Sequence, residues 1–199
     1  MQLDTLFVFL LSASILTLSP GPDIIYVFIK SSTEGLRSGI NTVFGLTTGL
    51  IFHTFLLVFG VSALIKSNEY VFFVLKLFGF FYFIFLAFST YNESLKINKR
   101  PYLEKSDFIT ALLMNVLNPK VSIFFIAFFP NYIFHNSWSY ELQFSILGLL
   151  FWLIANTIFL IVVFISSVNT IFIKKIIRHN KIKIFKIIFY LIISVWILV

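Results

Sequence analysis

Cysteine is absent from the 199-residue chain, and charged residues are scarce. Without cysteine the protein has no disulfide, no thiolate metal site and no dithiol redox pair. Charged residues make up 12% of the sequence, about half the share of about 25% that a soluble domain carries. In their place the sequence is 59% hydrophobic, with a mean hydropathy of +1.00. We therefore interpret the chain as a membrane protein whose surroundings are the lipid bilayer.

The net charge of +7 raises the question of a nucleic-acid partner. A phosphate-binding surface needs a water-facing domain with basic residues gathered on one face. Here the basic residues cluster in short segments between long apolar runs, so we predict no nucleic-acid binding. The first residues, MQLDTLF, include no positively charged region and no small-residue cleavage site, so we expect the first apolar run to stay in the mature protein.

The apolar runs set the expected membrane spans, because a bilayer core needs about 20 apolar residues per helix. The last run carries Lys183 and Lys186, whose ammonium groups must reach the membrane interface, so a five-span alternative stays open. We predict one all-α transmembrane domain, 1–199, with six helices at about 4–28, 39–65, 69–91, 107–133, 143–172 and 182–199.

The basic residues between the spans predict the orientation of the chain. Most of the 15 lysines and arginines lie in the segments 29–38, 92–106 and 173–183, whereas the connections on the other side hold Lys66 alone. Lysine and arginine are enriched in cytoplasmic loops. We therefore expect these three segments in the cytoplasm and both termini outside it.

The two halves of the chain, about 1–99 and 100–199, share a weak internal similarity. LSPGPDIIYVFI (18–29) aligns with LNPKVSIFFIAF (117–128). With three spans in each half, the halves cross the membrane in opposite directions, an inverted repeat that is common in transporters. Chance similarity between apolar stretches is the alternative. The aligned identical residues include Pro20 with Pro119 and Gly49 with Gly148.

A proline motif interrupts the first and the fourth apolar run. SPGPD (19–23) places two prolines, a glycine and a carboxylate inside the first run, and NPK (118–120) interrupts the fourth. Serine and asparagine are favoured N-cap residues, and proline is favoured at the first helical position. We expect each motif to end one half-helix and begin another, with Ser19 and Asn118 as the caps. A new helix start exposes N–H groups and a partial positive charge, which suits an anionic group.

Asp23 is the most informative residue at these breaks. A charged group near the bilayer middle costs on the order of 2.5–3.5 kcal/mol, and folding alone gives no reason to accept that cost. The helix start favours the charged form and the hydrocarbon disfavours it, so we expect the carboxylate to gain and lose a proton. The bland alternative is a kink whose freed backbone groups are satisfied by neighbouring helices. Substrate-binding or gating roles are predicted for Ser19, Pro20, Gly21, Pro22, Asp23, Asn115, Asn118, Pro119 and Lys120.

These motifs resemble the LysE/RhtB family of amino-acid exporters. The resemblance rests on SPGPD, the glycine-containing second run, LKLFGFFYFIFLAF and NVLNPKVSIFFIAFFPNYI, in that order, over about residues 5–133. It implies six membrane helices in the bacterial cytoplasmic membrane and efflux of amino acids or related metabolites, driven by the proton gradient. The lysine-rich C-terminal part and the 28 phenylalanines depart from the family pattern and leave the substrate undefined.

Small and polar residues mark the other spans. Gly45, Gly49 and His53 follow one helical stripe, which Gly60 extends, and small residues let two helices approach closely. His53 is either a buried neutral histidine bonded to a carbonyl or, with Asp23, a member of a proton relay, since histidine titrates near physiological pH. The glycines expected to serve helix packing are Gly45, Gly49, Gly60, Gly79 and Gly148.

Three polar side chains of the fourth run, Asn115, Asn118 and Ser122, share a face. They serve either interhelical hydrogen bonds or contacts with substrate. Lys120 lies next to the break, where it is expected to pair with Asp23 or with a substrate carboxylate. Lys76 in the third run is expected to reach the membrane interface.

Other functional classes find less support in these residues. An intramembrane enzyme needs a nucleophile with a base, a carboxylate dyad or metal ligands, and Asp23 is alone as a deep carboxylate, so we predict no catalytic residue, metal site or cofactor. A membrane scaffold has no need of breaks in both halves. The sequence thus favours a secondary active exporter of amino acids coupled to protons, with a scaffold or an exporter of another small solute or metal ion as alternatives. The oligomeric state, a homo-oligomer included, stays open.

Overall fold

The computed structural model describes residues 3–19, 21–67, 69–92, 106–168 and 180–198. Throughout these ranges the ordered elements are helices, and no strand occurs in them. The predicted all-α class is therefore correct for the described part of the chain. Pro20 and most of the predicted cytoplasmic segments 92–106 and 173–181 lie outside the described residues.

The helices follow the apolar runs closely. The second run forms α3, a π-helix η1 and α4 without interruption, and the fourth forms α6, α7, a π-helix η2 and a short 3₁₀-helix η3. Their bounds are α1 (Leu3–Leu18), α2 (Pro22–Thr33), α3 (Leu36–Phe55), η1 (Leu56–Val61), α4 (Ser62–Ser67), α5 (Glu69–Asn92), α6 (Asp107–Val116), α7 (Pro119–Ile123), η2 (Phe124–Phe128), η3 (Phe129–Tyr132), α8 (Tyr140–Val168) and α10 (Asn180–Leu198).

Both predicted breaks are present. The axes of α1 and α2 differ by 55°, and the axis of α6 differs by 49° from that of the segment Pro119–Tyr132. Proline cannot donate the backbone hydrogen bond of a continuing helix, which separates the half-helices at these points. Each new half-helix has its proline in the first turn, Pro22 in α2 and Pro119 in α7.

The two breaks differ in their caps. Asn118 is the N-cap of α7, as predicted, and its side-chain oxygen accepts a hydrogen bond from the backbone N–H of Lys120 at 3.1 Å. The prediction that Ser19 caps the second half-helix is wrong, because α2 begins at Pro22 and its N-cap is Gly21, with no side-chain cap. The second proline of the motif, rather than the first, takes the favoured first helical position.

Three of the described helices are long and apolar enough to cross a membrane, and the number rises to five if each bent pair counts as one span. These are the segments Leu36–Ile65, Tyr70–Tyr91 and Tyr140–Val168 and the two broken pairs. The sixth predicted span corresponds to α10, whose first half carries three lysines. Six spans and an inverted repeat therefore stay predictions.

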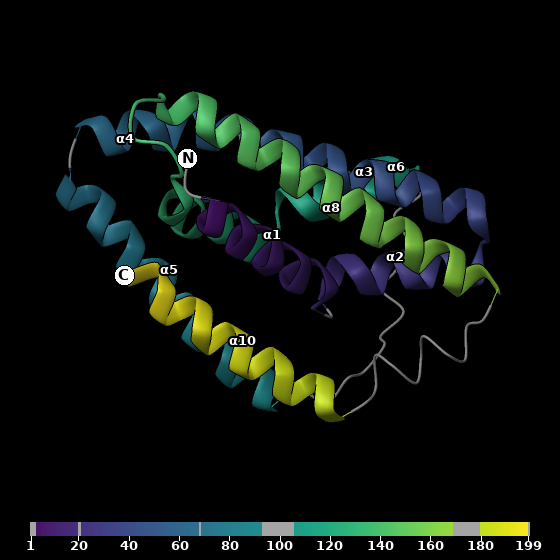
Figure 1. The fold of residues 1–199 in the computed structure, drawn as a ribbon. Coiled ribbons are helices and arrows are strands. Elements are labelled where there is room, and N and C mark those ends of the chain that lie inside the picture. Colours follow the sequence, from purple (N-terminus) through teal and green to yellow (C-terminus); the bar gives the residue numbers. More distant parts are fainter. Residues whose placement is uncertain (1–2, 20, 68, 93–105, 169–179, 199) are drawn as a thin grey trace.

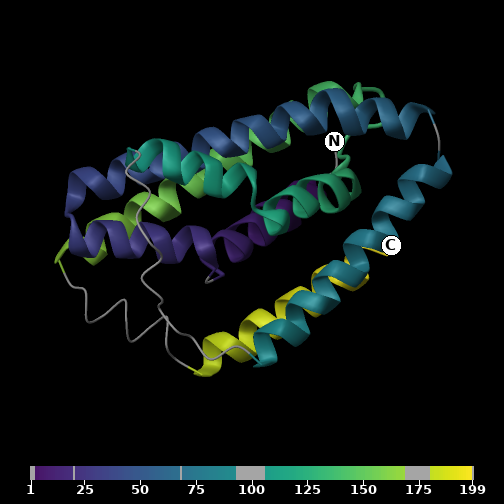
Figure 2. The ribbon, with the colours of Figure 1, turned by 180° about the vertical axis from the view of Figure 1, so that it is seen from behind.

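The helices form a bundle with a pair beside it (Figure 1). Within the bundle α3 packs against α6 and α8, and α2 packs against α3 and α8, while α5 and α10 pack along each other. Figure 2 shows the same division from behind. In both views the connection from α2 to α3 lies at the end of the molecule opposite the marked N- and C-terminal ends. This arrangement suits the predicted orientation, although which end faces the cytoplasm stays a prediction.

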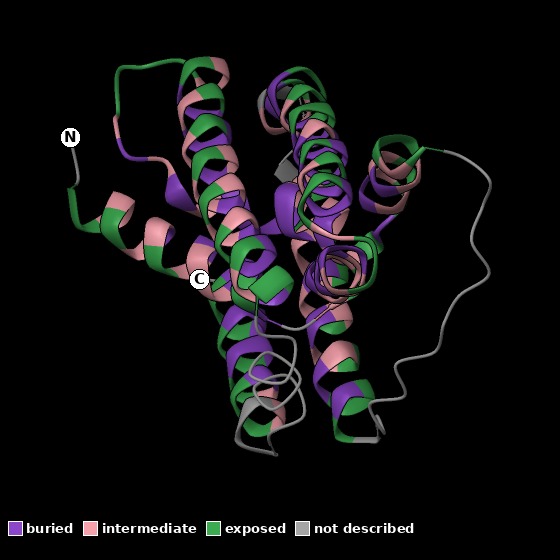
Figure 3. Cartoon of the chain, turned by 90° about the vertical axis from the view of Figure 1, so that its right-hand side faces the viewer, coloured by how far each residue is buried: buried purple, intermediate pink, exposed green. Residues whose placement is uncertain are grey.

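Aromatic side chains fill the centre of the bundle. Phe124 stacks on Phe128 with ring centroids 4.4 Å apart, and Phe125 stacks on Phe129 at 4.3 Å. The buried faces of the helices turn inward and the exposed faces turn outward (Figure 3). The outward faces are also apolar, with Phe59 69% exposed, and lipid is the solvent in which such a surface is stable.

Glycines allow α3 to approach α6 closely. A Cβ atom on Gly45 would collide with the side chain of Ala111, and one on Gly49 would lie 2.5 Å from the side-chain oxygen of Asn115. Both positions require glycine because a neighbouring helix occupies the space of a side chain.

The remaining glycines differ from one another. A Cβ atom would collide with Ala127 at Gly79 and with Thr54 at Gly148, whereas at Gly60 it would meet no atom of the described residues within 4 Å. Within the described part of the chain, Gly60 therefore has no close helix contact, contrary to the prediction. Gly60 lies in the π-helix η1, where the wider turn rotates later side chains away from the α-helical stripe.

Candidate functional site

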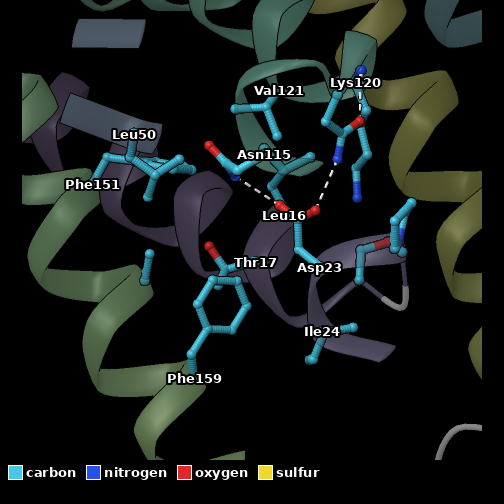
Figure 4. A pocket seen from close by; sticks show the side chains of 15 residues that line it. Leu16, Thr17, Asp23, Ile24, Leu50, Asn115, Lys120, Val121, Phe151 and Phe159 are labelled. Atoms are coloured by element: carbon cyan, nitrogen blue, oxygen red, sulfur yellow. Dashed lines mark hydrogen bonds between the residues drawn. The ribbon is translucent and has the colours of Figure 1, made fainter. Parts of the chain in front are cut away.

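The two helix breaks meet at the carboxylate of Asp23 (Figure 4). Asp23 lies in the first turn of α2. Its Oδ2 accepts a hydrogen bond from Nδ2 of Asn115 at 2.8 Å, and its Oδ1 accepts one from Nδ2 of Asn118 at 3.0 Å. Asn115 ends α6 and Asn118 begins α7, so the single acid of the first break is held by both sides of the second.

Asn118 has its amide orientation fixed by two contacts. Its oxygen caps α7 by accepting from the backbone of Lys120, which leaves the NH₂ group to face Asp23. The cap that starts the half-helix and the contact that holds the acid are thus made by one side chain.

The carboxylate of Asp23 is hydrogen-bonded by two neutral amide groups. Lys120 forms no ion pair with it in the part of the chain that the structure describes. An ionised carboxylate has about four acceptor positions, and the two amides occupy one on each oxygen. Within the described residues, no other side chain donates a hydrogen bond to the remaining positions.

A cavity of about 40 Å³ lies against this carboxylate. Its polar side is formed by Ser19, Asp23, Asn115, Asn118 and Lys120, and its apolar side includes Leu16, Leu50, Phe151 and Phe159. At 10–15 Å³ or somewhat more for each water, this volume admits roughly three waters. Any larger solute requires the helices around the cavity to move apart.

Asn115 has one polar atom without a partner. Its side chain is 1% exposed, and among the described residues its Oδ1 has no hydrogen-bond partner. Figure 4 shows this oxygen directed away from Asp23 and toward the side of Leu50. A buried acceptor without a donor is costly, and this oxygen instead packs against Gly49 of α3.

His53 contacts the site through the backbone of Asn115. Its Nε2–H donates to the carbonyl oxygen of Asn115 at 3.2 Å, and its side chain is buried. This contact matches the first of the two predicted alternatives, a buried histidine bonded to a carbonyl. A role of His53 in proton coupling stays a prediction.

Some predicted residues do not line the cavity. The hydroxyl of Ser122 donates to the carbonyl of Asn118 in its own helix at 3.2 Å. Lys76, which was expected at the membrane interface and not at the cavity, lies on α5 with its ammonium 6.0 Å from the ring centre of Phe72. Pro20 lies outside the described residues, and Pro119 starts α7 but does not line the cavity.

Sequence reasoning missed Tyr190, which α10 brings to the first break. The hydroxyl oxygens of Tyr190 and Ser19 are 3.4 Å apart, and the ammonium of Lys120 lies 5.6 Å from the centre of the tyrosine ring. No motif marks Tyr190 in the sequence, since it is an ordinary aromatic residue in an apolar helix.

A second polar cluster, at the far ends of α2 and α6, was also missed. Nζ of Lys30 lies 2.9 Å from Glu34 and 2.6 Å from Asp107. The hydroxyl of Ser38 donates to Asp107 at 2.7 Å, and its oxygen lies 3.1 Å from Glu34. The four-residue spacing of Lys30 and Glu34 is a recognisable helical pair. The contact with Asp107 joins distant segments and has no local signal.

Comparison with known proteins places the chain in a family. The model of the LysE type translocators matches residues 14–198. The chain belongs to this family. Because this is a family of translocators, the match is consistent with the prediction of a transport protein rather than an enzyme. The family match therefore covers nearly the whole of this chain, beyond the residues 5–133 over which the motifs carried the resemblance.

Curated relatives of this LysE type translocator include two efflux proteins. A homoserine/homoserine lactone efflux protein of Salmonella typhimurium is 30% identical over 137 residues, covering 67% of this chain and 66% of the relative. A protein of the same description from Salmonella typhi has the same identity and coverage. The match thus spans just under two thirds of these relatives. An uncharacterised membrane protein of Vibrio cholerae is 27% identical over 160 residues, covering 75% of this chain and 74% of the relative. No solved structure gives a significant match.

Proposed function

We propose that this protein is a secondary active exporter of amino acids in the bacterial cytoplasmic membrane, driven by protons. The observation that carries the proposal is the carboxylate of Asp23, which neutral amides hold beside a cavity where two broken helices meet. Membership of the translocator family and the efflux function named for the Salmonella relatives support the direction of transport.

The substrate class follows from the groups around the cavity. Homoserine and its lactone, named for the relatives, share an ammonium group, whereas the lactone has no free carboxylate. A cation is complementary to the carboxylate of Asp23, which lines the cavity. We infer that the substrate ammonium binds at this carboxylate. In a substrate with a free carboxylate, that group faces Lys120, whose ammonium lines the same cavity.

Export requires the cavity to open to each side in turn. At about 40 Å³ it is too small for an amino acid, so binding of the substrate requires the surrounding helices to move apart. The breaks supply the flexible points, because α2 and α6 each end there and turn as short rigid segments.

Asp23 is proposed to exchange its substrate for a proton. A carboxylate that releases an ammonium group inside the membrane is left with an uncompensated charge, and protonation removes it. One proton entering down a potential of about 100 mV supplies roughly 2.3 kcal/mol. That energy supports a substrate gradient of about 50-fold, at about 1.4 kcal/mol for each factor of ten.

Metabolite accumulation tests the proposed function. Cells that contain the protein and cells that lack it are loaded with homoserine, and the amino acid is measured inside the cells and in the medium over time. Cells with the protein are expected to hold less homoserine and to release it faster. A panel of other amino acids in the same assay defines the substrate range. Equal pools for every compound tested, with the protein present in the membrane, would contradict an exporter of amino acids.

A further inference from the structure

Tyr190 connects the two helix breaks to the last helix. It lies on α10 and is 3% exposed. Its hydroxyl oxygen is 3.4 Å from that of Ser19 at the first break, and its ring centre is 5.6 Å from Nζ of Lys120 at the second. Figure 1 shows α10 as part of the pair beside the bundle, so through this residue the pair contacts Ser19 and Lys120, which line the cavity.

The position of the Lys120 ammonium needs an explanation. A Cβ atom on Gly21 would lie 3.4 Å from it, which places the cation beside the start of α2, where the helix has partial positive charge. The opposite charge of Asp23 lines the same cavity, yet the two form no ion pair among the described residues. In Figure 4 Lys120 and Asn115 lie to either side of Asp23.

The ring of Tyr190 supplies the missing attraction. The face of an aromatic ring carries negative charge density and attracts a cation within about 6 Å of its centre. Phe83 packs against the tyrosine ring with centroids 6.0 Å apart, and Ser19 contacts its hydroxyl, so the ring has a defined place from which to hold the lysine.

We propose that Tyr190 is a positioning residue that holds the Lys120 ammonium apart from Asp23, so that the site prefers substrates with both an ammonium and a free carboxylate. This inference rests on the proposed function. With the ring in place, one zwitterionic amino acid bridges the anion of Asp23 and the cation of Lys120. Without the Tyr190 ring, Lys120 is no longer held where it can bind the substrate carboxylate. A substrate that binds through its ammonium alone then loses less affinity than a zwitterionic amino acid.

The test compares homoserine with homoserine lactone in vesicles containing the full-length protein. The KM of each compound is measured for the wild type and for Tyr190→Ala, Tyr190→Phe and Lys120→Met. A hydrogen bond to a charged group corresponds to about tenfold or more in affinity. We therefore expect Tyr190→Ala and Lys120→Met to raise the KM of homoserine at least about tenfold more than that of the lactone. Tyr190→Phe keeps the ring and is expected to keep the preference.

Two controls separate positioning from loss of structure. Ile197→Ala removes a buried side chain from the far end of α10 and is expected to leave the ratio of the two KM values unchanged. In the double variant Tyr190→Ala with Lys120→Met, the ratio is expected to equal that of Lys120→Met alone, because the tyrosine acts through the lysine. The ratio does not change when a variant merely folds less well, since both compounds then lose transport equally.

The outcomes distinguish the inference from the function on which it rests. If the wild type transports neither compound nor any other amino acid, the proposed function fails and the inference falls with it. If the wild type transports homoserine but Tyr190→Ala changes both KM values equally, the function stands and the positioning role is wrong. A shift in Tyr190→Phe as large as in Tyr190→Ala would contradict the contact with the ring face.

Discussion

The same two helices, α2 and α6, meet through polar side chains at both of their ends, and the two meeting points are built differently. At the break, Asp23 in the first turn of α2 accepts from Asn115 near the end of α6. At the opposite ends, Lys30 in the last turn of α2 contacts Asp107 in the first turn of α6. One contact joins a charge to a neutral amide, and the other joins two opposite charges.

The difference lies in how completely the charges are compensated. The ammonium of Lys30 has two carboxylate partners, and the hydroxyl of Ser38 donates a hydrogen bond to Asp107. Asp23 has two neutral donors and a cavity beside it. A compensated cluster is suited to holding helices together, whereas an acid with open acceptor positions beside a cavity is suited to binding a cation.

The largest effect is expected from removing the first break. Replacing Pro20, Gly21 and Pro22 by alanine allows α1 and α2 to continue as one helix, since alanine is the best helix former. Asp23 then loses its place opposite the second break, and export is expected to be abolished while the protein still inserts. Homoserine efflux at equal membrane abundance measures this. Undiminished efflux would show that the prolines only shape packing.

Breaking the compensated cluster is expected to cost stability. Lys30→Met removes the buried ammonium that contacts Glu34 and Asp107. Because both carboxylates are partly exposed, we expect a loss on the order of 1–3 kcal/mol, below the cost for a fully buried pair. Thermal unfolding in detergent is expected to show a clearly lower midpoint. Lys76→Met is the matched control, because Lys76 has no ion pair among the described residues. Equal midpoints for the two variants would contradict a stabilising role of the cluster.

A smaller effect separates two glycines on the same long helix. Gly49→Ala pushes a methyl group against Asn115, which holds Asp23, whereas Gly60→Ala meets open space. We expect Gly49→Ala to reduce export several-fold and Gly60→Ala to leave it unchanged. Transport rates at matched abundance decide this. A loss in Gly60→Ala comparable to that in Gly49→Ala would mean that the π-helix does not turn Gly60 away from its neighbours.

The orientation of the two meeting points across the membrane is tested by a variant that is expected to keep its function. The chain has no cysteine, so Lys99→Cys introduces a single thiol into the segment 92–106. We expect an impermeant thiol reagent to label this variant in opened cells but not in intact ones. Labelling in intact cells would place the Lys30 cluster at the outer end of the protein.

The positions of the helices and of the breaks were predictable because their causes are local. Apolar length predicts spans, and proline after a capping residue predicts a new helix start, as at Asn118. The cap at the first break was mispredicted because two prolines compete for the first helical position. Gly60 was mispredicted because it lies in a π-helix, whose wider turn moves it off the face that Gly45 and Gly49 share.

The long-range contacts had no comparable signal. Tyr190 reaches Ser19 only through the packing of α10, and Lys30 reaches Asp107 only through the packing of α2 and α6. From the sequence, Asn115 and Asn118 were expected to share a face, and Lys120 to pair with Asp23 or with a substrate carboxylate, but no pattern indicated that the two amides contact Asp23. Which of them touch is decided by the 55° and 49° bends, whose directions a sequence pattern does not encode.

The most direct test of the central role of Asp23 is the coupling of Asp23→Asn. Vesicles containing the wild type or this variant are assayed for exchange of homoserine between equal pools and for uphill transport under an imposed proton gradient. The amide keeps an oxygen for the substrate ammonium but carries no titratable proton, so we expect exchange to persist and uphill transport to be lost. If Asp23→Asn still builds a homoserine gradient that an uncoupler collapses, Asp23 is not the proton site, and His53 becomes the next candidate.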